Sequence, residues 1–192
     1  MMNLIDKYVI AINLIGFVAF LINTALYSFT AEKQIDVVVT IICVLGGAMG
    51  IFLAVVLFDR KAEKRNMMSR VFLLCLLIIE IIVFLYIKGI RLMRIRELFS
   101  SGNTIRYIII YSIGINIITF FAFLIDKINA IEKRSRIRIV TLLGFAFFGG
   151  SVGAIVSMYL FRHKTQKDYF AVGVPLIMLM QFIVIWFLIF GK

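Results

Sequence analysis

Long apolar runs, rather than short alternations of apolar and polar residues, dominate this chain. Runs of about 20 residues, which is the length an α-helix needs to cross the hydrocarbon core, are separated by short polar connections. We therefore predict an all-α membrane protein with six transmembrane helices, at Tyr8–Phe29, Val37–Phe58, Val71–Ile87, Tyr107–Ile125, Ile139–Phe161 and Phe170–Phe190.

The two halves of the chain match each other without a gap when one is shifted by 103 residues. Polar and glycine matches carry the comparison, because apolar helices resemble one another by chance. Tyr8 falls on Tyr111, and Asn13 falls on Asn116. Gly46, Gly47 and Gly50 fall on Gly149, Gly150 and Gly153. We predict two tandem three-helix repeats, at residues 1–87 and 107–192, joined by a basic linker at residues 88–106.

Three spans per repeat is an odd number, so the second repeat is expected to be inverted relative to the first. With six full spans, the Lys and Arg residues divide 12 against 9 and place both termini in the cytoplasm. If the two glycine-rich middle segments were re-entrant instead, the division would be 14 against 7. We expect the two middle segments to span the membrane fully, although the division of the Lys and Arg residues favours re-entrant segments.

The glycines of the middle segments form stripes with a four-residue spacing, which lets two helix backbones approach closely. The stripes predict that the two middle helices cross each other. Packing of each stripe within its own repeat is the alternative, and exposure of carbonyls to an ion at a loosened glycine pair is a further one.

Several polar side chains lie inside the apolar runs and are candidates for function: Asn13, Glu80, Asn116, Thr119 and Gln181. An amide in hydrocarbon needs a partner, so interhelix bonding competes with a substrate contact for the asparagines. Glu80 is the sole carboxylate well inside a run, and its counterpart in the second repeat is Ile183. A carboxylate at membrane depth is a functional candidate by default, although a neutral or hydrogen-bonded Glu80 is the alternative.

Composition agrees with lipid as the solvent, since 63% of the residues are hydrophobic and 16% are charged. The net charge of +11 fits basic loops that meet anionic headgroups. The densest chemistry lies in the second repeat. Arg, Lys and hydroxyl groups together suit phosphate or carboxylate recognition, with a solvated loop that only sets topology as the alternative. The candidate anion-binding residues are Asp126, Lys127, Arg136, Arg162, His163, Lys164 and Thr165.

The second repeat carries four polar and glycine motifs in a fixed order. They are Asn116-x-x-Thr119-Phe120, Asp126-Lys127, Gly149-Gly150-Ser151-x-Gly153-Ala154 and Arg162-His163-Lys164-Thr165-x-Lys167-x-x-Phe170. Through these motifs, residues Tyr111–Phe187 resemble the domain of unknown function 1294 family. The first repeat looks like a diverged copy. Where the family has Arg-Ile-Pro-Glu, this chain has Arg136-Ile137-Arg138-Ile139. The resemblance implies a small protein of the bacterial inner membrane without an established activity.

Two functions are compatible with these features. One is a transporter or channel for a small solute or an ion, built from inverted repeats. The other is a membrane-anchored binding or scaffold protein whose basic loops hold phospholipid headgroups or nucleic acid. An enzyme using His163 is disfavoured, because Asp126 and His163 would lie about 30 Å apart at opposite ends of a spanning helix.

No cofactor, metal ion or catalytic residue is expected, because the chain has a single histidine and no nucleotide-binding or zinc motif. The expected partners are the lipid bilayer and its anionic headgroups. A homodimer is left open, and nucleic acid is not expected.

Overall fold

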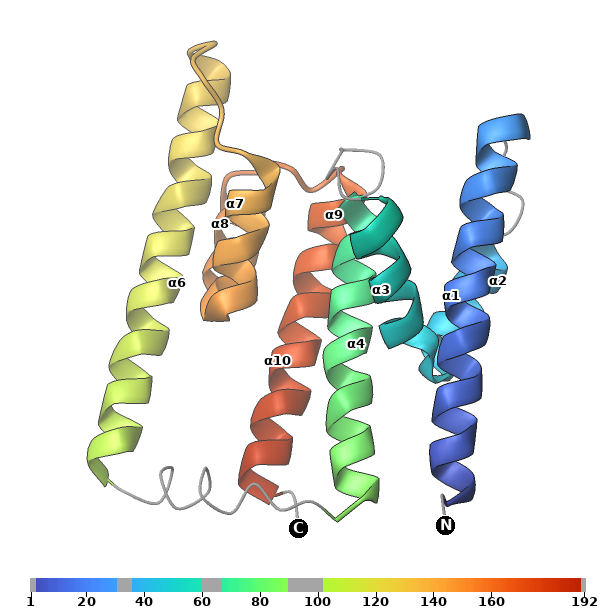
Figure 1. Ribbon diagram of the computed structural model, residues 1–192. Coiled ribbons are helices and arrows are strands. Elements are labelled where there is room, and N and C mark those ends of the chain that lie inside the picture. Colours follow the sequence, from blue (N-terminus) through green and yellow to red (C-terminus); the bar gives the residue numbers. More distant parts are fainter. Residues whose placement is uncertain (1–2, 31–35, 60–66, 90–101, 191–192) are drawn as a thin grey trace. The chain divides into compact units, whose positions relative to one another are not determined.

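The computed structural model describes residues 3–30, 36–59, 67–89 and 102–190, and these residues form helices joined by turns (Figure 1). The chain divides into two compact units. Unit 1 holds Met1–Glu63 and Phe72–Ile81, and unit 2 holds Lys64–Val71 and Ile82–Lys192. Six helical segments are long and apolar enough to cross a membrane, as the sequence predicts.

Four of these segments are continuous or nearly so. Helix α1 covers Leu4–Thr30, α4 covers Met67–Ile87 and α6 covers Gly102–Ile131. The short helix α9 (Asp168–Ala171) leads directly into α10 (Gly173–Phe190). At a rise of 1.5 Å per residue, α6 is roughly 45 Å long and can cross a hydrocarbon core of about 30 Å.

The two middle segments are each broken into a pair of short helices. In unit 1, α2 (Asp36–Ile42) and α3 (Ala48–Phe58) meet at the wide turn Cys43–Gly47. In unit 2, α7 (Ile139–Phe145) and α8 (Ser151–Leu160) meet at the wide turn Ala146–Gly150. None of these helices reaches 30 Å, since the longest has 11 residues and is roughly 16 Å long.

A glycine with positive φ makes each break. Gly46 has φ +112° and Gly149 has φ +114°, a region that side chains with a Cβ rarely enter. In unit 2 the chain enters α7 and leaves α8 at the same end of α6, so the two short helices form a hairpin (Figure 1). The prediction of one continuous helix over Ile139–Phe161 is therefore wrong.

Unit 1 has the same local arrangement. The face of Gly16 on α1 touches both arms of the break, Ile42 on α2 and Ile51 on α3. A buried apolar cluster of Cys43, Ala48, Ile51 and Leu73 joins this broken segment to α4. The prediction of a single straight helix over Val37–Phe58 is likewise wrong, because the bend at Gly46 turns α3 back along α1.

The glycine stripes serve packing within each unit. A Cβ on Gly50 would clash with the backbone oxygen of Asn13, and a Cβ on Gly153 would clash with that of Asn116. The hairpins thus press against α1 and α6 at these glycines, as in the alternative that the sequence left open. These glycine faces pack against α1 and α6, in place of the predicted crossing of the two middle helices.

We expect Gly149→Ala to lower the free energy of unfolding by about 1–2 kcal/mol, because Ala resists the positive φ at the break. Thermal unfolding of the detergent-purified protein measures this change. Gly144→Ala is the matched control, since Gly144 lies within α7 with open space around its Cβ position. Ala there should be neutral or stabilise by about 0.5–1 kcal/mol. Equal stabilities of the two variants would contradict the hairpin geometry.

Candidate functional site

Hydrogen bonds from α6 satisfy the backbone groups that the break in unit 2 exposes. The Tyr111 hydroxyl donates to the carbonyl of Phe148 at 2.7 Å, and the Asn116 amide donates to the carbonyl of Gly149 at 3.0 Å. Asn116 Oδ1 accepts from the N–H of Gly153 at 2.7 Å. Since the same amide also donates to Ser112 O, both of its N–H groups are used within the unit.

Unit 1 has the same set of bonds, each displaced by 103 residues. Tyr8 donates to Leu45 O at 2.7 Å, Asn13 donates to Gly46 O at 3.0 Å, and Gly50 N donates to Asn13 Oδ1 at 2.7 Å. The two asparagines therefore hold hairpins in place, and neither keeps a free amide proton for a substrate. Thr119 is buried and donates to Ile115 O on its own helix.

Gln181 and Glu80 reach the two breaks from a third helix. Gln181 on α10 donates to Ala146 O and Phe147 O at 2.8 and 2.9 Å and accepts from Ser151 Oγ at 2.6 Å. Glu80 on α4 accepts from the N–H of Ala48, the first residue of α3, at 3.1 Å. A carboxylate at a helix N-terminus is stabilised by the exposed N–H groups and the helix dipole.

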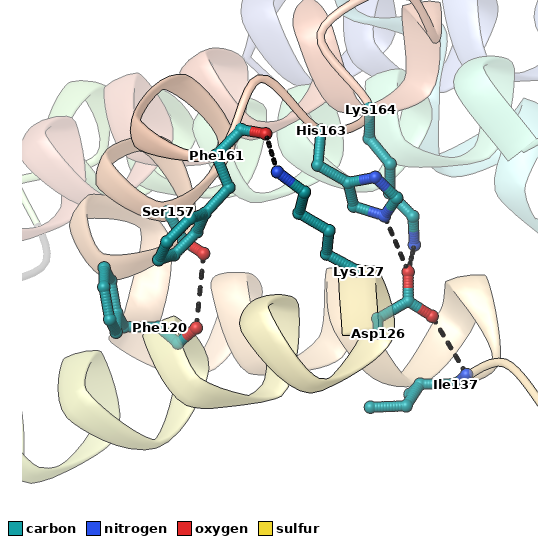
Figure 2. Close-up of polar contacts among 8 residues, drawn as sticks. All are labelled: Phe120, Asp126, Lys127, Ile137, Ser157, Phe161, His163 and Lys164. Atoms are coloured by element: carbon teal, nitrogen blue, oxygen red, sulfur yellow. Dashed lines mark hydrogen bonds and ion pairs between the residues drawn. The ribbon is translucent and has the colours of Figure 1, made fainter. Parts of the chain in front are cut away.

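Asp126 ties both ends of the unit 2 hairpin to α6 (Figure 2). Its fully buried carboxylate accepts from the N–H of Ile137 at 3.0 Å through Oδ1. Its Oδ2 lies 2.7 Å from Lys164 Nζ and 3.1 Å from His163 Nε2. Ile137 comes just before α7, and His163 comes just after α8. The expected separation of about 30 Å between Asp126 and His163 is thus wrong, because the intervening segment folds back on itself.

Aromatic rings line the other side of the Lys164 ammonium. Its Nζ lies 4.5 Å from the ring centroid of Phe170 and 5.9 Å from that of Phe123. Burial lowers the pKa of Lys164, the ion pair with Asp126 raises it, and the nearby charge of Arg136 lowers it again. The pKa therefore lies below its usual value. Burial and the charge of Arg136 thus disfavour the cation, and Asp126 favours it.

Three basic residues around this cluster have left-handed backbone conformations. Lys133, Arg162 and Lys164 have φ values of +57°, +46° and +63°. Glycine is the usual residue for this conformation after a helix, and a residue with a Cβ costs on the order of 1 kcal/mol there. Lys133 and Arg162 follow the ends of α6 and α8. Each of these positions therefore carries a charged residue where glycine would give a more stable protein.

The remaining candidates lie on the two loops that Asp126 joins. Arg136 and Arg162 are exposed, and Thr165 is half-buried. Lys127 turns back to donate to Phe161 O at 2.7 Å. The structure thus gathers the predicted anion-binding residues at one end of α6. Within the same unit, Asn116 and Gln181 bond to the break and Thr119 bonds to its own helix. Asn13 and Glu80 bond to the break of unit 1.

Some contributors were not anticipated as site residues. The sequence indicated Tyr8 and Tyr111 only as equivalent positions of the two repeats and gave them no role. The Ile137 N–H and the rings of Phe123 and Phe170 carry no sequence signal of their own. Among the described residues, no group of three His, Cys, Asp or Glu side chains could hold a metal ion.

We expect Asp126→Asn to lower the free energy of unfolding by about 3 kcal/mol, because it removes the counter-charge of a largely buried Lys164. Glu132→Gln is the matched control, since Glu132 pairs with Arg134 on the surface. That change should stay within about 0.5 kcal/mol. Chemical unfolding in detergent measures both, and an Asp126→Asn effect no larger than the control would contradict the central role of this carboxylate.

Comparison with known proteins identifies relatives of the second half of the chain. A family model described as "Protein of unknown function (DUF1294)" matches residues 116–170, a stretch that begins at Asn116 and ends at Phe170. It therefore contains the hairpin and the Asp126 cluster. The uncharacterised protein YsdA of Bacillus subtilis (strain 168) is 36% identical over 75 residues, which are 39% of this chain and 84% of that protein. No solved structure matches. Since the match covers most of YsdA, this chain belongs to the DUF1294 family.

Proposed function

We propose that this protein is a multi-pass protein of the bacterial cytoplasmic membrane that binds phosphate-bearing headgroups of anionic lipids at one basic face. The basic face consists of the exposed residues Lys133, Arg134, Arg136, Arg138, Arg162 and Lys167. The observation that carries the proposal is the Asp126 carboxylate, which binds Ile137 on one loop and His163 and Lys164 on the other. Two basic loops thereby become one surface at the end of α6.

The hairpins support a membrane topology. In the topology that we propose, each hairpin enters and leaves the membrane on one side, and the four loops around the two hairpins lie on that side. These loops carry 14 of the 21 Lys and Arg residues. The positive-inside rule puts this side in the cytoplasm. Both termini and the linker 88–106 then face the opposite side, in place of the cytoplasmic termini expected from six full spans.

A tandem duplication accounts for the two hairpins. It is supported by three hydrogen bonds and one positive-φ glycine that recur at an offset of 103 residues. With two crossings and one hairpin, each repeat has an even number of crossings. The reason for expecting an inverted second repeat is then lost, and we propose repeats of the same orientation in the membrane.

Transport along the breaks is the weaker proposal. Unwound backbone in transporters coordinates ions through free carbonyls. Here the carbonyls of Ala146, Phe147, Phe148 and Gly149 accept from Gln181, Tyr111 and Asn116. These oxygens are occupied by the protein itself, so the break serves to build the hairpin.

The topology is tested by labelling single cysteines from outside intact cells, after replacement of the buried Cys43 and Cys75. Cysteines at the exposed positions Ser135 and Gln166 flank the hairpin, and both should be protected from an impermeant reagent. A cysteine at the exposed Asn103, at the start of α6, should be labelled. Labelling of only one of Ser135 and Gln166 would mean that the segment between them crosses the membrane.

Headgroup binding is tested by native mass spectrometry of the full chain titrated with phosphatidylglycerol. We expect Arg136→Gln/Arg162→Gln to weaken binding by about 1 kcal/mol per removed charge, or roughly fivefold each. Lys7→Gln/Arg106→Gln removes the same charge from exposed positions outside the basic face and should leave the affinity unchanged. Equal losses in the two double variants would overturn the proposal.

A further inference from the structure

The hydrogen bonds of Asp126 fix where the proton sits on His163. The ionised carboxylate can only accept, and it takes a bond from Lys164 at 2.7 Å and from the Ile137 N–H at 3.0 Å. His163 Nε2, at 3.1 Å from Oδ2, must therefore carry a hydrogen and donate it. In the neutral imidazole the other nitrogen, Nδ1, is then an acceptor, and in the imidazolium it is a donor.

The free nitrogen of His163 is available to a ligand. Nδ1 points away from Asp126 (Figure 2), and the His163 side chain is 20% exposed. Its backbone N–H is bonded to Met158 O, so the loop that presents the ring is itself anchored. His163 thus presents Nδ1 to a ligand while Nε2 stays bound to Asp126.

The two segments that the Asp126 cluster joins contain more basic than acidic residues. Asp126–Arg138 and Phe161–Asp168 carry eight Lys and Arg residues against three acidic residues. Of these acids, Asp126 is engaged with Lys164 and His163, and Glu132 is engaged with Arg134. The charge of Arg136 also acts on Lys164. An anion beside these groups would relieve the repulsion between the cations.

The backbone indicates that these charges are retained at a conformational cost. Arg162 and Lys164, on either side of His163, both have positive φ. Glycine would adopt these angles freely. Residues with strained backbone angles occur more often at ligand sites than elsewhere, because the surrounding structure there maintains the strain at a cost in stability.

We propose that Arg162, His163 and Lys164, backed by Asp126 and Arg136, form a binding site selective for a phosphomonoester. The inference rests on the proposed headgroup-binding function and names its ligand class. A phosphomonoester has a second ionisation with a pKa near 6, so its proton can be shared with Nδ1 of His163. A phosphodiester has no such proton. The arginine side chains supply the charge-assisted hydrogen bonds that any phosphate receives.

The test compares two short-chain lipids that differ by one methyl group, dioctanoyl phosphatidic acid and its methyl ester, phosphatidylmethanol. Isothermal titration calorimetry of the full chain in neutral detergent at pH 7 gives each affinity. Repeating the titrations in two buffers of different ionisation enthalpy gives the protons taken up. We expect phosphatidic acid to bind about tenfold more tightly, the effect of one hydrogen bond to a charged group, and with net proton uptake.

His163→Gln keeps a side-chain N–H for Asp126 but cannot change its charge. We expect it to reduce the preference to about threefold or less and to abolish the proton uptake. Lys7→Gln is the matched control, because it removes an exposed charge outside the basic face and leaves His163 intact. It should keep both the preference and the proton uptake. If His163→Gln does not fold, the two wild-type titrations still decide the question.

Glycerol phosphate as a competitor distinguishes the two sources of the ligand. Competition at millimolar concentration would mean that the site takes a soluble phosphomonoester, and no competition would mean that it takes the lipid. Equal affinities of the wild-type protein for the two lipids, or proton uptake that persists in His163→Gln, would overturn the phosphomonoester site while leaving headgroup binding intact. Absence of binding to both lipids would overturn the headgroup function as well.

Discussion

The buried carboxylate of Asp126 closes the base of the unit 2 hairpin, and the arrangement of the basic residues depends on it. One side chain on α6 holds the chain just before α7 and just after α8. Neither loop has a regular structure long enough to position itself. Because the carboxylate is inaccessible to water, its three partners are held more rigidly than a surface ion pair would hold them. A cluster of this kind specifies geometry at least as much as it adds stability.

A broken helix in a membrane creates a second requirement, at the opposite end of the hairpin. Each backbone group freed at the break needs a partner, since hydrocarbon offers none. Tyr111, Asn116 and Gln181 supply these partners in unit 2, and Tyr8, Asn13 and Glu80 do so in unit 1. Glycines serve the turn in two ways. Gly46 and Gly149 turn the chain through their positive φ, and Gly50 and Gly153 let the hairpins approach α1 and α6 closely.

The sequence predicts the apolar segments well, because hydropathy depends on composition over about 20 residues and not on geometry. It does not reveal a break inside such a segment, since a hairpin and a straight helix of the same residues are equally apolar. One signal did point to the break, because the division of 14 against 7 basic residues favoured re-entrance. The recurrence of Tyr8, Asn13 and the glycine pair in one register predicted the duplication and not the turn.

The pairing of Asp126 with His163 could not be predicted for the same geometric reason. Their separation of 37 residues places them at opposite ends of a straight span, and only the turn at Gly149 brings them to 3.1 Å. The partner of Glu80 was hidden as well, because that partner is a backbone N–H, and a backbone group leaves no mark on the sequence. Asn13 and Asn116 were easier. An amide at membrane depth must be bonded, and interhelix bonding was one of the two alternatives that the sequence left open for them.

The two repeats separate the requirements of folding from those of binding. Both units keep the tyrosine, the asparagine and the positive-φ glycine that build the turn. The long helices of the two repeats differ at the pair of positions that includes Asp126, because Asn23 and Thr24 stand where the second repeat has Asp126 and Lys127. The turn is thus built from residues that the two repeats share, whereas Asp126 binds Ile137, His163 and Lys164 from a position where they differ. The ligand site that we propose lies on the residues in which the second repeat departs from the first.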